Sequence, residues 1–257
     1  MSDPVSKPLS VSIVTYNSAE VIIELLQSMK TQLDLSQIDV YLIDNASQDD
    51  TVIRVQTVYP WVKLICNQRN VGFGTAHNQV LRHLRSTYHA VINPDIVFLE
   101  DSLSQLAGYL DTTPEAVIVT PRILNRDGSE QHLPKLLPTP RYLLARRLLP
   151  NSSHSQQLNR AYTRADEDFS VPTAIQSASG CFFVIRTEVL RKLGGFDERF
   201  FIYFEDNDLC KRAAGYGQII FYPTTAVVHG YSRDSTKNLQ ALSHLLRSAF
   251  RYFRTHN

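Results

Sequence analysis

The sequence is poor in cysteine and carries no large excess of either charge. Its three cysteines, Cys66, Cys181 and Cys210, are odd in number and far apart, so they predict neither a disulfide framework nor a zinc site. They fit a reducing compartment. With 26 basic and 25 acidic residues, the chain lacks the positive charge of a protein that binds nucleic acid over a large surface.

Long hydrophobic runs are also missing. No N-terminal apolar run reaches the length of a signal peptide, and no stretch of about 18 consecutive apolar residues occurs anywhere. We therefore expect a cytoplasmic protein that does not span a membrane by itself, although it could lie on one. At 257 residues and 43% hydrophobic, the chain can bury the core of one large domain.

Short apolar runs, each ending in polar residues, dominate the first half of the chain. They are "VSIVTYN" (11–17), "VYLIDN" (40–45), "VKLICN" (62–67), "AVINPD" (90–95) and "AVIVTP" (116–121). Helical spacing separates them, as in Val21, Leu25, Leu26 and Met29, or Val80, Leu81 and Leu84. This alternation predicts an α/β fold, a Rossmann-like and mostly parallel sheet flanked by helices.

Polar side chains follow these predicted strands at the point where each one ends. They are Thr15, Tyr16, Asn17, Asp44, Asn45, Asn70, Asn93 and Asp95. Ligands of open α/β sheets bind beyond the carboxyl ends of the strands, so we expect the binding site at this edge.

The stretch "AVINPDIVF" (90–98) places a carboxylate where a buried strand breaks. Pro94 cannot donate to a sheet ladder and holds Asn93 extended, so the strand should end there and turn outward at Asp95. Two interpretations stay open at this point. Asn, Pro and Asp are common turn residues, and Asp95 could equally be a functional acid at the lip of the sheet.

Two further strand ends carry candidate ligand contacts. Asp44 could accept from a base or ribose, or it could form an Asx-turn before a helix started by Ser47 and Asp50. In "NQRNVGFGTAHN" (67–78), the glycines precede a helix whose amides could meet a phosphate. The dinucleotide fingerprint is incomplete, because His77 stands where its third glycine belongs.

Six motifs in order carry a family resemblance: "VSIVTYNS", "LIDNASQDDT", "NQRNVGFGTAHN", "NPDI", "SASGCFFVIRTEVLRKLGGFDERFFIYFEDNDLCKRAAGYG" and "VVHG". The chain resembles the bacterial inverting glycosyltransferases of family two, which have the GT-A fold. Within them it most resembles the rhamnosyltransferases of O-antigen and other cell-surface polysaccharide. The resemblance implies a single domain, with a donor half at 1–121 and an acceptor half at 122–257.

The resemblance assigns roles on the donor side. Asn93-Pro94-Asp95 stands where the family has its Asp-x-Asp metal motif, so Asp95 and His229 would hold Mg²⁺ or Mn²⁺. A histidine after an apolar strand could instead be a core residue. The nucleoside-diphosphate sugar would contact residues at the strand ends, namely Thr15, Tyr16, Asn17, Asp44, Asn45, Asn70, Gly72, Asn93 and Asp95.

On the acceptor side, the resemblance implies that Ser179 and Gly180 allow close approach of a sugar. In "FEDNDLCKR" (204–212) it makes Asp206 the catalytic base and lets Glu205 orient the acceptor hydroxyl. Acids at a helix start are favoured by the helix dipole even without chemistry, and Asp208 can pair with Arg212. In "GGFDERF" (194–200) we expect the phenylalanines to anchor a loop and Asp197 to be structural.

Two basic, leucine-rich segments suggest a membrane surface. One is "PRYLLARRLLP" (140–150), inside a basic insert at 134–175, and the other is an amphipathic C-terminal helix in 239–257. The insert favours the membrane, whereas the C-terminal helix could equally pack on the sheet. A lipid-linked glycan acceptor at the inner face of the cytoplasmic membrane would explain both segments. The oligomeric state stays open.

The resemblance therefore implies a metal-dependent inverting transferase, which we expect to move L-rhamnose from dTDP-L-rhamnose to polyprenyl-diphosphate-linked GlcNAc or a growing glycan. A different UDP- or dTDP-sugar is the alternative donor. An oxidoreductase would need its glycine fingerprint after the first strand, where Tyr16-Asn17-Ser18 stands. A non-catalytic nucleotide-sugar-binding module would have no use for both Asp95 and Asp206.

Overall fold

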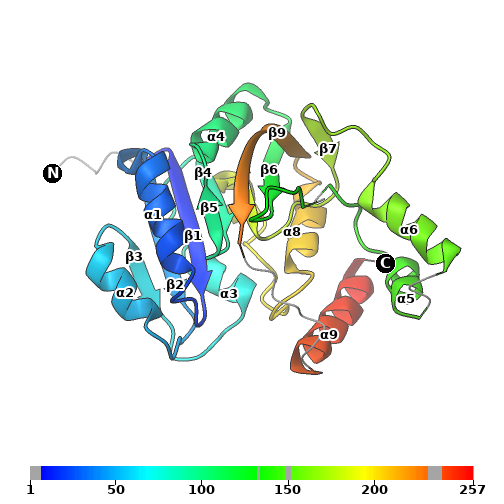
Figure 1. Ribbon diagram of the computed structural model, residues 1–257, viewed down its shortest axis with the longest axis horizontal. Helices are drawn as coiled ribbons and strands as arrows, with labels where there is room; N and C mark the ends of the chain where they lie inside the picture. Colours follow the sequence, from blue (N-terminus) through cyan, green and yellow to red (C-terminus); the bar gives the residue numbers. More distant parts are fainter. Residues whose placement is uncertain (1–6, 132–133, 149–151, 231–238, 257) are drawn as a thin grey trace.

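The computed structural model describes residues 7–131, 134–148, 152–230 and 239–256 (Figure 1). The strands are β1 (Leu9–Thr15), β2 (Ile38–Asp44), β3 (Lys63–Cys66), β4 (Tyr88–Ile92), β5 (Ile96–Phe98), β6 (Ala116–Leu124), β7 (Thr173–Ile175), β8 (Phe182–Arg186) and β9 (Gln218–His229). The helices are α1 (Ile22–Gln32), α2 (Thr51–Val58), α3 (Phe73–Asn78), α4 (Ser102–Thr112), α5 (Pro140–Leu148), α6 (Ser153–Thr163), α7 (Thr187–Lys192), α8 (Glu205–Ala213) and α9 (Leu239–His256).

The strands form one sheet in the order β3-β2-β1-β4-β8-β6-β9-β5, with β7 paired to β9. The first four strands of the chain are parallel, and the antiparallel β8 lies between β4 and β6. The five predicted strands therefore exist and all run in one direction. In Figure 1 the arrowheads of β1 and β9 point down, toward the side where α9 lies.

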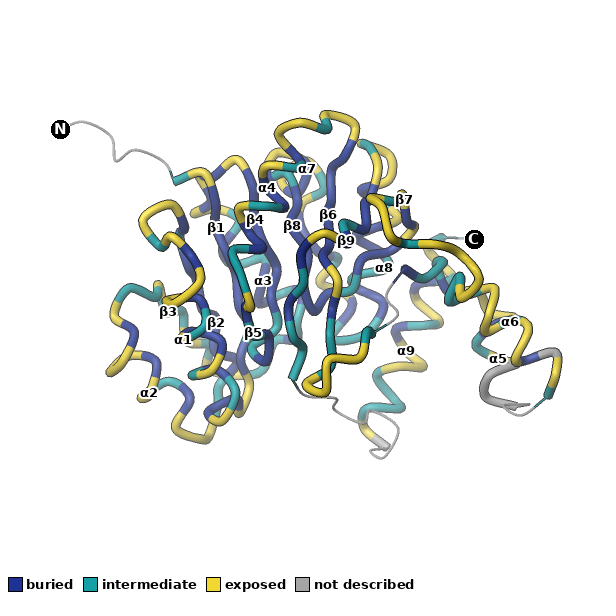
Figure 2. Tube along the Cα trace, turned by 45° about the horizontal axis from the view of Figure 1, so that its top comes forward, coloured by how far each residue is buried: buried dark blue, intermediate teal, exposed yellow. Residues whose placement is uncertain are grey.

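Helices cover both faces of the sheet, as predicted for an α/β fold. One hydrophobic cluster joins the sheet to α1, α2 and α4, and a second joins it to α3, α7 and α8. Successive residues of β8 alternate between them: Phe182 packs into the first cluster and Phe183 into the second. Figure 2 shows the buried sheet between more exposed outer elements. None of the three cysteines is in a disulfide.

Helix α1 buries Leu25, Leu26 and Met29 of the predicted stripe, while Val21 is its half-buried N-cap residue, and the helix predicted to include residues 80–84 ends early. Val80 and Leu84 are buried as expected, yet α3 stops at Asn78. The chain continues in turns in which Val80 N–H bonds to the His77 carbonyl, three residues back. The apolar spacing alone could not distinguish a helix from tight turns that bury the same side chains.

The acceptor half ends in helices that pack on one another. Tyr142 of α5 stacks on Tyr162 of α6 with centroids 3.9 Å apart, and Leu143 joins a cluster with Phe204 and Tyr252. Thus α5 has a packed face, while the side chains of residues 145–150 lie outside the described set. Helix α9 packs on α8 and on the loop before it, and no strand residue belongs to its hydrophobic cluster among the described residues. Within the described residues, no helix is both apolar and long enough to cross a bilayer.

A line of polar side chains crosses the core between β1 and β4. The hydroxyl of Ser12 contacts His77 Nδ1 at 2.7 Å and His89 Nε2 at 2.8 Å, and Ser10 contacts His89 Nδ1 at 2.8 Å. Burial lowers the pKa of His89 to about 3 and that of His77 well below 6.5. Both histidines are therefore neutral in the folded protein at pH 7.

The free energy of unfolding should fall as pH drops from 6.5 toward 3. The unfolded chain protonates both histidines in this window and the folded chain does not, so each contributes a slope of up to about 1.4 kcal/mol per pH unit. Urea unfolding of the wild type and His89→Gln across this range measures the effect. The variant should show a shallower slope, and equal slopes would contradict the assignment.

Candidate functional site

Asn93-Pro94-Asp95 forms the turn between β4 and β5, and this turn leaves a functional role of Asp95 open. The Ile96 N–H donates to the Asn93 carbonyl at 3.4 Å. The turn also brings Asp95 to β9, because the Asp95 carbonyl accepts from Gly230 N–H at 2.8 Å. Asp95 is only 9% exposed and lies at the carboxyl edge of the sheet.

His229 faces Asp95 at this edge and is not a core histidine, since its side chain is 18% exposed. Its Nε2 lies 3.3 Å from Asp95 Oδ1, which is buried and accepts no hydrogen bond within the described residues. Its Nδ1 lies 3.3 Å from Gln131 Oε1, a residue that the sequence analysis missed. If Nδ1 donates to Gln131, the Nε2 lone pair faces the Asn93 amide nitrogen, which lies 3.4 Å away, and a metal ion at Nε2 would replace this contact.

The Asp95–His229 pair fits two ligands of one divalent ion. Ligands about 2.1 Å from an octahedral ion, at a right angle to each other, lie about 3 Å apart, close to the observed 3.3 Å. No group of three or more His, Cys, Asp or Glu side chains that could hold a metal occurs in the described part of the chain. Most of the coordination shell would therefore come from water and substrate phosphates, which these ions accept readily.

The carboxylate oxygens of Asp44 accept hydrogen bonds from other residues of the protein. Its Oδ1 accepts from the hydroxyls of Thr15 and Ser47, and its Oδ2 accepts from Ser47 N–H at 2.8 Å. The turn interpretation of Asp44 thus describes its contacts. The expectation that Ser47 starts the helix was wrong: α2 begins at Thr51, whose N–H donates to Asp49 at 3.1 Å. Thr15 is fully buried behind Asp44.

The other predicted donor residues lie in loops at the same edge. Tyr16 and Asn17 are exposed, and Asn17 is left-handed at φ 51°. Asn45 is buried and donates to the Gly72 carbonyl at 3.2 Å, while Asn70 Oδ1 accepts from Gly72 N–H at 2.9 Å. Asn45 and Asn70 therefore shape the loop that begins α3.

Gly72 permits a close backbone approach between the two halves of the chain. A Cβ there would lie 2.5 Å from the Phe201 carbonyl oxygen, and φ is +90°. That oxygen accepts from Phe73 N–H at 2.9 Å. The first amides of this loop thus bond within the protein, so the sequence-based expectation of a phosphate at these amides finds no support in their geometry.

The donor and acceptor sides meet at the residues before β8. Asn93 N–H donates to the Cys181 carbonyl at 2.8 Å, and Gly180 N–H donates to Asp206 Oδ2 at 3.1 Å. Ser179 Oγ accepts from Cys181 N–H at 3.3 Å. A side chain at Gly180 would touch the Cβ of Asp206 at 3.5 Å. The predicted metal and base residues therefore share one edge of the sheet.

Glu205 and Asp206 are adjacent carboxylates in different surroundings. Asp206 is partly exposed and accepts three N–H bonds, from Gly180 and from the backbone and side chain of Asn207. Glu205 is 7% exposed, and its Oε2 has no partner among the described residues. Burial, then the charge of Asp206, raises the pKa of Glu205 to about 8. Burial also raises the pKa of Asp206.

We assign the single negative charge of this pair at pH 7 to Asp206, because its N–H donors favour the ionised form.

Two left-handed residues precede the Glu205–Asp206 pair, Tyr203 at φ 71° and Phe204 at φ 68°. Strained backbone of this kind persists where surrounding contacts enforce it. Here Phe204 packs against Tyr252 of α9.

The remaining acids of this region are structural, as predicted. Asp208 is 1% exposed and binds Arg212, with Nε to Oδ2 at 2.8 Å. It also contacts His256 Nε2 at 2.7 Å, a partner that the sequence analysis did not identify. Asp197 pairs with Arg199. Phe196 and Phe200 are both buried anchors of the loop.

The model of Glycosyl transferase family 2 matches residues 10–194, well over half of the chain. The chain belongs to glycosyl transferase family 2. The edge described above is therefore the candidate active site of a family 2 glycosyltransferase, and the family resemblance of the motifs is confirmed.

Curated relatives of this family 2 glycosyltransferase include rhamnosyltransferases. The N-acetylglucosaminyl-diphospho-decaprenol L-rhamnosyltransferase of Mycobacterium tuberculosis is 26% identical over 91% of this chain and 80% of its own length. The rhamnosyltransferase WbbL of Escherichia coli is 25% identical over 70% of this chain and 69% of its own.

Solved structures of low identity share the fold. Staphylococcus aureus TarS 1-349 in complex with UDP has a TM-score of 0.63 at 17% identity over 87% of this chain, which spans 60% of the TarS chain. The mannosyltransferase PcManGT of Pyrobaculum calidifontis, in complex with GDP-Man and Mn²⁺, has a TM-score of 0.65 at 20% identity. The match covers 97% of this chain and 65% of the PcManGT chain. The GT-A fold is thereby confirmed.

The contact between Gly72 and Phe201 makes a stability prediction. Gly72→Ala should lower the free energy of unfolding by about 2 to 4 kcal/mol, because Cβ meets a backbone oxygen at an unfavourable φ. Gly108→Ala is the matched control: it lies inside α4 with nothing within 4 Å and should raise stability by about 0.5 to 1 kcal/mol. Chemical denaturation measures both, and a neutral Gly72→Ala would contradict the close approach.

Proposed function

We propose that this family 2 glycosyltransferase moves L-rhamnose, with inversion, from dTDP-L-rhamnose to GlcNAc carried on polyprenyl diphosphate or to a growing glycan of cell-surface polysaccharide. The observation that carries the proposal is the meeting of Asp95 and His229 with Asp206 at one sheet edge, through Cys181 and Gly180. The mycobacterial relative, named for a lipid-diphosphate GlcNAc acceptor, supports the sugar and the acceptor.

The proposed chemistry assigns one task to each side. Asp206 withdraws the proton of the acceptor hydroxyl while the hydroxyl oxygen bonds to the anomeric carbon of the donor sugar. The bond from that carbon to the nucleoside diphosphate breaks at the same time. Asp95 and His229 would hold Mg²⁺ or Mn²⁺, and PcManGT, a neighbour in fold, was solved with Mn²⁺. When bound, the ion offsets charge that grows on the departing diphosphate.

The neighbours of Asp206 tune it for this task. Its raised pKa makes it a stronger base, while its three N–H donors keep it ionised and oriented. Because Glu205 is buried, we assign it an indirect role and not a contact with the acceptor hydroxyl. Its protonated carboxyl adds no second negative charge beside the base Asp206.

The proposed location follows from the acceptor. Residues 1–121 would bind donor and residues 122–257 acceptor, with the enzyme peripheral on the inner face of the cytoplasmic membrane. The side chains of Arg146 and Arg147 lie outside the described set, so the exposed part of α9 now gives the clearest support for a membrane partner. A panel of UDP- and dTDP-sugars, assayed with GlcNAc-diphosphoryl-alkyl acceptor, tests the donor. Transfer of another sugar in preference to rhamnose would overturn that choice.

Asp206→Asn should lower the turnover number by roughly two to four orders of magnitude and leave donor binding nearly intact, as expected for a lost general base. Glu205→Gln copies the protonated carboxyl and should keep transfer within about tenfold of the wild type. Steady-state kinetics and donor titration measure both. Normal turnover in Asp206→Asn would remove this residue from the mechanism and favour a non-catalytic binding module.

Asp95→Ala should weaken the binding of dTDP in the presence of Mn²⁺ by at least about tenfold, because half of the side-chain ligand pair is lost. Asp127→Ala removes an exposed acid from the turn after β6 and should change nothing. Calorimetry with and without EDTA gives the readout, and EDTA should also abolish transfer by the wild type. Metal-independent dTDP binding with full activity in EDTA would refute the metal assignment.

A further inference from the structure

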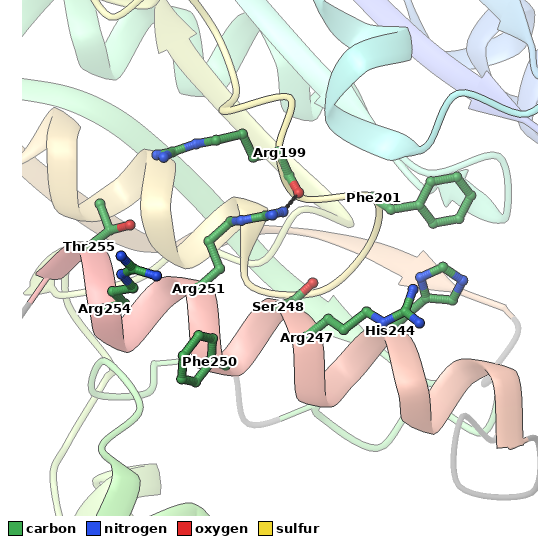
Figure 3. Close-up of a pocket in the computed structure, with 9 residues that line it drawn as sticks. All are labelled: Arg199, Phe201, His244, Arg247, Ser248, Phe250, Arg251, Arg254 and Thr255. Carbon is green, nitrogen blue, oxygen red and sulfur yellow. Dashed lines mark hydrogen bonds between the residues drawn. The ribbon is translucent and has the colours of Figure 1, made fainter.

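A basic cleft of about 790 Å³ lies between α9 and the loop before α8 (Figure 3). Three of its arginines, at positions 247, 251 and 254, are three or four residues apart and therefore share one face of α9. Arg199 stands on the opposite wall. We call this the arginine cleft, and the residues used below are Arg199, Phe201, His244, Arg247, Arg251 and Arg254.

The arginine cleft holds more positive charge than its surroundings neutralise. Helix α9 contains no Asp or Glu, and no acidic residue lines the cleft. The Arg199 side chain pairs with Asp197, and Arg251 donates to the Arg199 carbonyl across the cleft, as Figure 3 shows. Within the described residues, the exposed Arg247 and Arg254 have no hydrogen-bond or ion-pair partner. The cleft thus has two exposed guanidinium groups that are available to an anion.

One end of the arginine cleft adjoins the proposed acceptor site. Phe201, stacked on His244 with centroids 4.7 Å apart, bonds through its carbonyl to Phe73 N–H at 2.9 Å. The Phe73 ring lies 3.5 Å from where a Gly180 Cβ would stand, and that point is 3.5 Å from Asp206 Cβ. The cleft therefore adjoins the surroundings of Asp206 through Phe201 and Phe73.

An apolar ridge runs beside the arginines on α9. Leu246 is 55% exposed and Phe250, one turn later, is 69% exposed, with Leu245 next to them. All three are exposed. The helix therefore offers two adjoining surfaces to solvent, one for anions and one for hydrocarbon.

We propose that the arginine cleft binds the diphosphate of the lipid-carried acceptor, with the first part of its polyprenyl chain on the Leu246–Phe250 ridge. This rests on the proposed function and adds to it the residues that select the acceptor. Guanidinium groups bind phosphate oxygens through paired, charge-assisted hydrogen bonds, which lysine does not reproduce. The ligand that matches this surface carries a sugar for the site beside Asp206, a diphosphate for the arginines and a hydrocarbon chain for the ridge, joined in that order.

The test compares two synthetic acceptors of equal chain length, GlcNAc-diphosphoryl-undecyl and GlcNAc-undecyl, in neutral detergent micelles. Arg247→Gln and Arg254→Gln should each raise KM for the diphosphoryl acceptor by about tenfold, as expected for a lost charge-assisted pair. The KM for GlcNAc-undecyl and for the donor should not change. Arg160→Gln is the matched control, since it removes an equal charge from an exposed ion pair on α6.

Three results would overturn the proposal. An equal rise of KM for both acceptors would make the arginines structural, and a rise of donor KM would assign them to the donor. An effect seen only with anionic vesicles, and absent in neutral micelles, would make the arginine cleft a docking site for bilayer lipid.

The double variant Leu246→Ser with Phe250→Ser tests the ridge. It should raise KM for undecyl acceptors more than for methyl acceptors.

A binding readout separates this proposal from the proposed function. Without donor, GlcNAc-diphosphoryl-undecyl should raise the melting temperature of the wild type more than that of Arg247→Gln, because ligand binding stabilises the folded state. If no nucleotide sugar is transferred but this difference holds, the function fails and the cleft stands. If rhamnose is transferred and the difference is absent, the proposed function stands and the proposed role of the arginine cleft fails.

Discussion

The buried carboxylate of Asp208 holds the acceptor side of the protein together. It binds Arg212 on its own helix and His256 on α9, and Arg212 in turn donates to the carbonyls of Leu193 and Gly195. One nearly inaccessible anion thus connects α8, α9 and the turn after α7. Removing this carboxylate would leave Arg212 and His256 without their shared partner, which is costly because buried polar groups need their partners. The position of Asp206, two residues earlier, depends on this connection.

The same region is joined to the donor side by backbone contacts. Phe73 bonds to Phe201, and Asn78 exchanges hydrogen bonds with the backbone of Phe196 through its amide group. Asn93 bonds to Cys181 at the centre of the sheet. The two carboxyl-edge loops are therefore held at fixed separation, which is what a transfer between two bound sugars requires. Glycine at position 72 makes the closest of these approaches sterically allowed.

Sequence reasoning predicted the five strands β1, β2, β3, β4 and β6, their common direction and the edge where polar residues collect, because apolar runs and turn residues are local signals. It placed Asp95, Asp206 and His229 together only through the family resemblance. It missed Gln131 and His256, whose partners are 98 and 48 residues away in the chain. For Asp44 it left a ligand contact and an Asx-turn both open, because the hydroxyl of Thr15, 29 residues away in the chain, cannot be placed from local sequence.

The Asp95–His229 pair has a consequence for the order of events. With two side chains as its ligands, a divalent ion would gain most of its affinity from the nucleotide, so the two would arrive as one complex and leave as one. Free nucleoside diphosphate and free metal would then each be poor inhibitors, while their complex would be a good one. Gln131, whose Oε1 lies 3.3 Å from His229 Nδ1, would then influence the affinity for that complex without touching either sugar.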